Sequence, residues 1–198
     1  MVTNRRRGTD YERYMLHRAE DVGFIDVERQ PLSGQLFQAK FKSDVKMSAI
    51  TPDDRRLDFL ISCKKTINRN SIQFAVEWLG ENETFAKNIN RIPILSFSLG
   101  GKPGQKMSVH IVISKEEFIK ITGNIRELNI RNMSFRGKKY LTITREKLDN
   151  CRHRVGSPNK IPVCSIYTNT EYFIFEIEDF YQAIMTEYKE VNGVNRWF

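Results

Sequence analysis

The sequence predicts a mixed α/β fold, with an α-β-β-β-α-β core that carries a mixed sheet and a basic α+β elaboration after it. Three observations predict this class: a helix-periodic segment near the start, a long hairpin in the first third, and later strand pairs that precede short amphipathic segments. The chain has 198 residues, 40% of them hydrophobic, enough for one domain with a real core. We place the core at 1–123 and the elaboration at 124–198, packed on it.

The first expected element is a helix over residues 9–22. Thr9-Asp10-Tyr11-Glu12 has the pattern of a capping box, in which the side chains of the first and fourth residues bond each other's backbone N–H groups. Apolar residues then recur at helical spacing until Gly23, which is typical of a helix end. Residues 24–30 alternate as a strand does and stop at Pro31.

The second expected element is a hairpin of strands 41–50 and 57–65, joined by a turn at 51–56. If the turn centres near Asp54, opposite residues have numbers that add to about 108, which sets Asp44 across from Lys64 and Lys46 across from Ser62. Since side chains alternate between faces, Val45, Met47, Ile61 and Cys63 are expected in the core. Asp53 belongs to the turn at the far end, and we reject it as a site residue.

The remaining elements follow in order. A helix is expected from Asn70 or Ser71 onward through Leu79, then strands at 92–99 and 108–113 and a helix at 114–123. The stretches "RIPILSFS" and "KIPVCSIY" each begin a strand, turn, strand and acidic-Phe helix. We interpret them as a weak internal repeat of a hairpin-plus-helix unit.

The charge indicates a polyanionic partner. The chain carries a net charge of +8, and residues 131–160 hold nine basic and two acidic residues, a local net charge of +7. Arg5-Arg6-Arg7 form a second basic cluster before the first helix. Both clusters also fit a solvated surface or a disordered arm. Phe135, Tyr140 and Tyr167 either stack on bases or pack into the core.

Other classes of protein are disfavoured. No apolar run is long enough to span a bilayer, and the arginine-rich start lacks the apolar stretch of a secretory signal. The three cysteines, Cys63, Cys151 and Cys164, are widely spaced without a Cys-x-x-Cys, which argues against a disulfide framework and a structural zinc site. We expect a cytoplasmic protein without membrane contact.

Several short motifs together resemble a nuclease family. The stretches "RRRGTDYERYMLHRAEDVGF" and "ERQPLSG", with "SDVKM" and "ISCKKT", resemble archaeal-type Holliday junction resolvases and their phage relatives in the PD-(D/E)XK nuclease superfamily, over roughly residues 4–120. The resemblance implies a restriction-endonuclease-like core, Mg2+ with Mn2+ as a substitute, branched DNA as substrate, and a homodimer. It also leans toward a prokaryotic or virus-infected host cell.

The resemblance assigns roles to five residues. Glu12 and Asp44 are expected to hold the metal, and Lys64 to position or help deprotonate the attacking water. Ser62 stands where the family has a glutamate. Some restriction endonucleases with a similar triplet carry that acid on the next helix, and Glu77 is the one acid at 72–79. We therefore expect that the acid has moved to Glu77, because a hard cation needs carboxylate oxygens from whichever element supplies them.

Simpler interpretations stay open for these residues: Glu12 as a helix cap, Asp44 paired with a neighbouring lysine, Lys64 as a solubilising strand end, and Glu77 in a polar stripe. The expected DNA contacts are Arg5, Arg6, Arg7, Arg29, Ser33, Lys46, Lys65, Arg136, Lys138 and Lys139. Three functions fit: a structure-selective endonuclease, a general or sequence-specific endonuclease, and a catalytically inactive nucleic-acid-binding module.

Overall fold

The computed structural model describes residues 4–30, 44–65, 70–99, 107–123, 125, 128–133, 140–153, 160–186, 189–191 and 194–196. In chain order the elements are α1 (Asn4–Val22), β1 (Ile25–Arg29), β2 (Val45–Ile50), β3 (Arg56–Lys65), β4 (Ser71–Ala75), α2 (Glu77–Asn88), β5 (Ile92–Leu99), β6 (Ser108–Ser114), α3 (Lys115–Thr122), β7 (Leu128–Met133), β8 (Tyr140–Thr144), α4 (Arg145–His153), β9 (Ile161–Tyr167), β10 (Glu171–Glu176), α5 (Ile177–Met185), β11 (Lys189–Val191) and β12 (Val194–Arg196).

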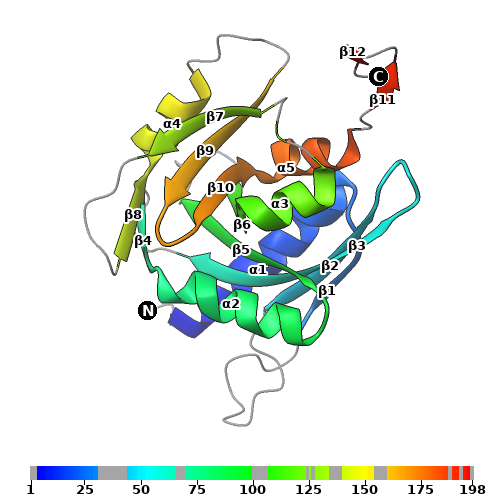
Figure 1. Ribbon diagram of the computed structural model, residues 1–198. Helices are drawn as coiled ribbons and strands as arrows, with labels where there is room; N and C mark the ends of the chain where they lie inside the picture. The colour runs from blue at the N-terminus through cyan, green and yellow to red at the C-terminus, as the bar shows by residue number, and fades with distance from the viewer. Residues whose placement is uncertain are drawn as a thin grey trace.

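One mixed sheet of eight strands organises the molecule, in the order β1-β2-β3-β5-β6-β10-β9-β7 (Figure 1). The pairs β3–β5 and β7–β9 are parallel, and the other pairs are antiparallel. The predicted mixed α/β class is confirmed, and the predicted α-β-β-β-α-β order is present as α1, β1, β2, β3, α2 and β5. The additional strand β4, between β3 and α2, lies outside the main sheet. The sheet continues past residue 123 into β10, β9 and β7.

Two apolar layers cover the sheet. On one face α1, α3 and α5 contribute Tyr11, Met15, Phe118 and Phe180, which bury together with the alternate residues Phe59 and Ile61 of β3. On the other face α2, α4 and the two-stranded ribbon β4–β8 bury Leu79, Leu148, Ile72, Leu141 and Ile143. None of the described helices is long and apolar enough to cross a membrane.

The prediction for the first helix was wrong at its start. α1 begins at Asn4, five residues before Thr9, so Thr9 is not a cap. Its hydroxyl accepts a hydrogen bond from Arg29 at 3.3 Å instead. The arginines at 5–7 therefore belong to the first turns of the helix backbone and not to an arm before it.

The predicted hairpin register was also wrong, by two residues. Val45 pairs with Ile61 and Lys46 with Leu60, so paired numbers add to 106 and not to 108. The reason is a tight turn, in which the Thr51 N–H bonds the Arg55 carbonyl at 2.9 Å and the Arg55 N–H bonds the Thr51 hydroxyl at 3.1 Å. Continuing the register past Val45 sets Asp44 across from Ser62. The expected burial of Val45, Met47 and Ile61 is confirmed.

The helix predicted from Asn70 or Ser71 begins later, at Glu77. Residues 71–75 instead form β4, which pairs with β8 from Ser71↔Thr144 to Ala75↔Tyr140. Tertiary pairing with a distant strand has overridden the local helical pattern. The interpretation of residues 161–184 as a second hairpin plus helix is confirmed by β9, β10 and α5.

Candidate active site

Asp44 is held at the junction of three strands. Its backbone N–H donates to the Ile61 carbonyl at 2.9 Å, and its carbonyl accepts from the Gln30 N–H at 2.9 Å. Its side-chain Oδ2 accepts a hydrogen bond from the Cys63 N–H at 2.7 Å. The carboxylate is thus fixed beside the carboxyl end of β3, where the sequence predicted an acid.

Cys63 is half-buried near the end of β3, between Ser62 and Lys64. Burial raises the pKa of Cys63 well above its usual value, the negative charges of Asp44 and then Glu12 raise it further, and the positive charge of Lys64 opposes them. Asp44 bonds the Cys63 N–H and Lys64 follows Cys63 on β3, while Glu12 bonds Arg29 of β1, which pairs with Val45 of β2. Glu12, Asp44 and Lys64 thus come from α1, from the residue before β2 and from the end of β3.

Glu12 is paired with Arg29. The Arg29 Nε lies 2.5 Å from Glu12 Oε2, and the Glu12 side chain is 13% exposed while that of Arg29 is 39% exposed. Arg29 was predicted to contact DNA, and it is joined to a carboxylate of the same site. A pairing of this kind neutralises part of the acidic charge around Cys63.

Lys64 points to the opposite face of β3 from Cys63. Its Nζ lies 4.7 Å from the centre of the Trp78 ring, within the range of a cation–π interaction. Trp78 is the second residue of α2, so this contact ties the end of β3 to the start of that helix. The aromatic ring restricts where the ammonium group can lie.

Glu77 and Ser62 have different environments. Glu77 is the first residue of α2 and is exposed, one position before the ring that holds Lys64. Ser62 is buried at 7% exposure and lies across the parallel pair from Leu95. No three acidic, histidine or cysteine side chains among the described residues are grouped closely enough to hold a metal ion by themselves. The metal set of Glu12, Asp44 and Glu77 stays a prediction.

The donor chemistry of the site fits a hard divalent cation in part. Glu12 and Asp44 supply carboxylate oxygens, the donors that Mg2+ and Mn2+ prefer. Glu12 already bonds Arg29, and one oxygen of Asp44 already accepts from Cys63. A carboxylate oxygen keeps lone pairs for further ligands after it accepts one hydrogen bond.

The predicted DNA contacts are only partly described. Lys46 lies on β2 opposite Leu60, and Lys65 ends β3 opposite Ser98. The side chains of Arg5, Arg6 and Arg7, and all of Ser33, Phe135, Arg136, Lys138 and Lys139, lie outside the described residues. Tyr140 and Tyr167 are 54% and 72% exposed, so neither packs into the core.

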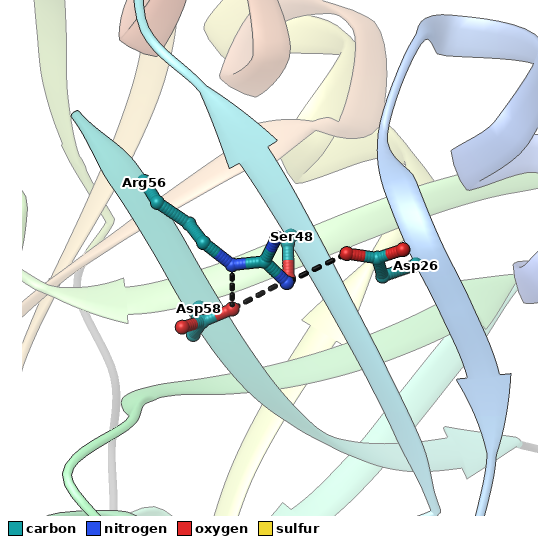
Figure 2. A network of polar contacts seen from close by, with 4 residues as sticks. All are labelled: Asp26, Ser48, Arg56 and Asp58. Atoms are coloured by element: carbon teal, nitrogen blue, oxygen red, sulfur yellow. Dashed lines mark hydrogen bonds and ion pairs between the residues drawn. The ribbon is translucent and has the colours of Figure 1, made fainter. Parts of the chain in front are cut away.

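A polar network that the sequence did not predict lies elsewhere on the hairpin (Figure 2). Arg56 Nη2 lies 2.6 Å from Asp26 and donates to the Ser48 hydroxyl at 3.0 Å. Arg56 Nε lies 3.0 Å from Asp58, which also accepts from Ser48 at 2.6 Å. The Ser48 hydrogen bond, then Arg56, lowers the pKa of Asp58. These acids are paired within the sheet, and the network fastens β1, β2 and β3 together. The pairing of Ser48 with Asp58 in the correct register is the signal that would have found it.

Comparison with known proteins gives a partial structural similarity. No family model matches the chain, and no curated protein matches it either. Among solved structures it is similar to Hjc, a Holliday junction resolvase from the archaeal hyperthermophile Archaeoglobus fulgidus, with 17% sequence identity and a TM-score of 0.37. The match covers 50% of this chain and 72% of that chain.

Proposed function

We propose that this protein is a metal-dependent endodeoxyribonuclease that cuts branched DNA, in the manner of a Holliday junction resolvase. The observation that carries the proposal is the placement of Asp44 and Lys64 at the end of β3, where Asp44 bonds the Cys63 N–H, with Glu12 bonded to Arg29 on the nearby β1. Two carboxylates and an ammonium group in this region suit phosphodiester hydrolysis, which needs a cation site next to a proton-transfer group.

Glu12 and Asp44 would hold Mg2+ or Mn2+ in this proposal, with Glu77 as the third acid. When bound, the ion would supply charge stabilisation at the scissile phosphate and a more acidic water molecule. Glu77 would take the place of the glutamate that Ser62 replaces. Its position at the first turn of α2, beside the ring that holds Lys64, supports that assignment.

Lys64 would place its ammonium group against the scissile phosphate and neutralise the charge that develops there. Its contact with Trp78 keeps the long side chain in a limited set of positions, which lowers the entropy lost on binding substrate. A compact ammonium group is also able to exchange a proton with water when its surroundings change its pKa.

The net charge of +8 supports DNA as the partner, since phosphates bind basic surfaces by releasing counterions. A junction has two strands to cut, so we propose a homodimer that acts in the cytoplasm of a prokaryotic or virus-infected cell. A general or sequence-specific endonuclease is the second form of the same activity, and its products would map to defined sequences on linear DNA.

A catalytically inactive DNA-binding module is a separate candidate, and two observations favour it. Ser62 stands in place of an acid, and the described acids do not group into a ready metal site. This candidate predicts binding without cleavage under every metal condition.

Cleavage of a labelled four-way junction, beside a linear duplex with the same arms, distinguishes these functions. The wild type, Asp44→Ala and Glu77→Ala are compared with Mg2+ and with EDTA. Asp53→Ala is the matched control, because it removes a carboxylate in the turn of the same hairpin, where it bonds Arg55. Junction cleavage that needs metal, persists in the control and fails in both variants supports the proposal. Binding by the wild type without any cleavage overturns it in favour of the inactive module.

A further inference from the structure

The chain contains the same run of elements twice. Unit one (residues 56–122) reads β3-β4-α2-β5-β6-α3, and unit two (residues 128–185) reads β7-β8-α4-β9-β10-α5. In each unit the first and fourth elements form a parallel pair, and the fourth and fifth an antiparallel pair. Unit one contributes β3-β5-β6 to the sheet and unit two follows with β10-β9-β7. The equivalent strands are thus in reversed order, with the first strand of each unit farthest from the boundary between the units.

The strand registers of the two units are identical. Phe59 pairs with Ile92 and Leu128 pairs with Ile161, which is a separation of 33 residues in both units (92 minus 59, and 161 minus 128). A shift of 69 residues (128 minus 59) therefore superposes β3 and β5 on β7 and β9. The same shift carries Ile92-Pro93 onto Ile161-Pro162 and the buried Leu79 onto the buried Leu148.

The two units are related by an approximate two-fold axis. In the ribbon β4–β8 the central pair is Gln73↔Thr142, and these residues are equivalent under the shift of 69. Where β6 meets β10 the central pair is Val112↔Ile174, and the shift there is 62 (174 minus 112), because unit one has a longer β5–β6 connection. When strands of two repeats pair, a residue lies opposite its own counterpart only where a two-fold axis relates the repeats.

The helices at the centre follow the same relation. The shift of 62 carries Ser114, the N-cap of α3, onto Glu176, the N-cap of α5, and carries Phe118 onto Phe180. Both phenylalanines are fully buried, with ring centres 6.5 Å apart. α3 and α5 lie against each other in Figure 1, as the symmetry requires.

Unit two has kept the fold and lacks the candidate site. The counterparts of Ser62 and Lys64 are Arg131 and Met133, and Met133 is buried in the apolar layer at 8% exposure. Asp44 lies before β2, which pairs with β3, whereas β7 is an edge strand, so the described part of unit two offers no counterpart of Asp44. Each chain has one candidate cutting site.

Unit two has also gained positive charge at the equivalent positions. Residues 62–91 contain five basic and three acidic residues, a net charge of +2, while their counterparts 131–160 contain nine basic and two acidic residues, a net charge of +7. Arg131 replaces Ser62, and Lys147 replaces Trp78. The basic side chains of this stretch that the structure describes are Arg131 on β7, Arg145 and Lys147 on α4, and Lys160 just before β9.

We propose that unit two is a non-cutting copy of the nuclease unit that binds the DNA backbone through its basic residues, while unit one cuts. The inference rests on the proposed function, because it takes DNA as the partner. A duplex that crosses the approximate two-fold axis would meet the candidate site on one side and the described basic residues of β7, α4 and Lys160 on the other. Resolution of a junction then still needs two chains, since each contributes one cut.

The test is DNA binding by the double variant Lys147→Ala/Lys160→Ala. Both lysines are exposed, on α4 and just before β9. The matched control, Lys87→Ala/Lys120→Ala, removes the same charge from exposed positions on α2 and α3 of unit one. Dissociation constants for a labelled duplex and a labelled junction are measured by fluorescence anisotropy across a salt series. Thermal unfolding of each variant verifies the fold.

Loss of two phosphate contacts is expected to reduce the slope of log Kd against log salt by about 1.8, because each contact contributes about 0.9. The control is expected to keep the wild-type slope. Equal slopes for the wild type and the unit two variant, or a larger loss in the control, overturn the inference.

Failure of the proposed function gives a different result. In that case the wild type fails to cut with Mg2+ while its salt slope still depends on unit two, or it does not bind DNA at all.

Discussion

Unit one and unit two share a fold and differ in what they carry at the end of their first strand. β3 ends in Ser62, Cys63 and Lys64 beside Asp44, while β7 ends in Arg131, Asn132 and the buried Met133. The apolar positions that face the two layers are preserved in both units, as Leu79 with Leu148 and Phe118 with Phe180 show. The comparison teaches that the apolar pattern maintains this architecture, and that the polar residues at the strand ends were free to diverge.

The first way to test the equivalence of the units is to truncate Phe118 and Phe180 separately to alanine. Each change is expected to lower the free energy of unfolding by about 3–5 kcal/mol, because each removes a fully buried ring. The two losses should be similar, and the double variant should lose less than their sum, since the rings are in contact. Denaturant unfolding measures all three. A large loss in only one variant would break the equivalence.

The second change gives unit one the residue of unit two at its site. Lys64→Met is expected to slow junction cleavage about 100- to 1,000-fold, as removal of one charge-stabilising group does, and to leave DNA binding nearly unchanged. Single-turnover rates and anisotropy separate the two effects. Lys87→Met makes the same chemical change at an exposed position of α2 and should cut at the wild-type rate. Slow cutting by that control would point to a general effect of charge.

The reverse change, Met133→Lys, puts an ammonium group into the apolar layer of unit two. We expect a loss of about 2–4 kcal/mol in the free energy of unfolding, because the ammonium charge would be buried among apolar side chains. Met133→Leu keeps the volume and should cost less than about 1.5 kcal/mol. Chemical denaturation measures both. No gain in cleavage is expected, and a gain would show that unit two still holds a working site.

The smallest expected effect concerns the polar network in unit one. The pKa of Asp58 is lowered in the folded protein, first by Ser48 and then by Arg56, so its contribution to stability is present above its unfolded pKa of about 3.9 and is lost as the pH falls through its folded pKa. Asp58→Asn should therefore lose less stability between neutral pH and acid than the wild type. Asp149→Asn, a change on exposed α4, is the control. Identical acid curves for wild type and Asp58→Asn would contradict this assignment.

Much of the core was predictable because its signals are local. The apolar spacing of Tyr11, Met15 and Ala19 predicted α1, and the alternation of Val45 and Met47 predicted β2. The hairpin register was missed because it depends on how the Thr51 hydroxyl and backbone close the turn, which changes every pairing by two residues. The strand β4 was missed because its partner β8 is far away in the chain.

The candidate site itself stays a prediction. Asp44 and Lys64 were selected from their positions at strand ends, and Glu12 from the resemblance of the first helix to resolvases. The contact of Lys64 with Trp78 was not predicted, since it needs the placement of α2 against β3. The repeat was visible only as its hairpin-plus-helix part, because β3 and β7 share register with their partners but little sequence.

The pairing of β4 with β8 has a consequence for folding during synthesis on the ribosome. β4 has no strand partner until β8 has been synthesised, and residues 76–139 separate the two strands. Chains leave the ribosome at about 5–20 residues per second, so β4 and the edge of β6 wait for several seconds with their backbone groups unpaired. During that time the unpaired backbone groups of β4 and β6 in unit one are open to pairing with the wrong strands and to binding by chaperones. Unit one is therefore made first but gains its last strand partners only while unit two is being made.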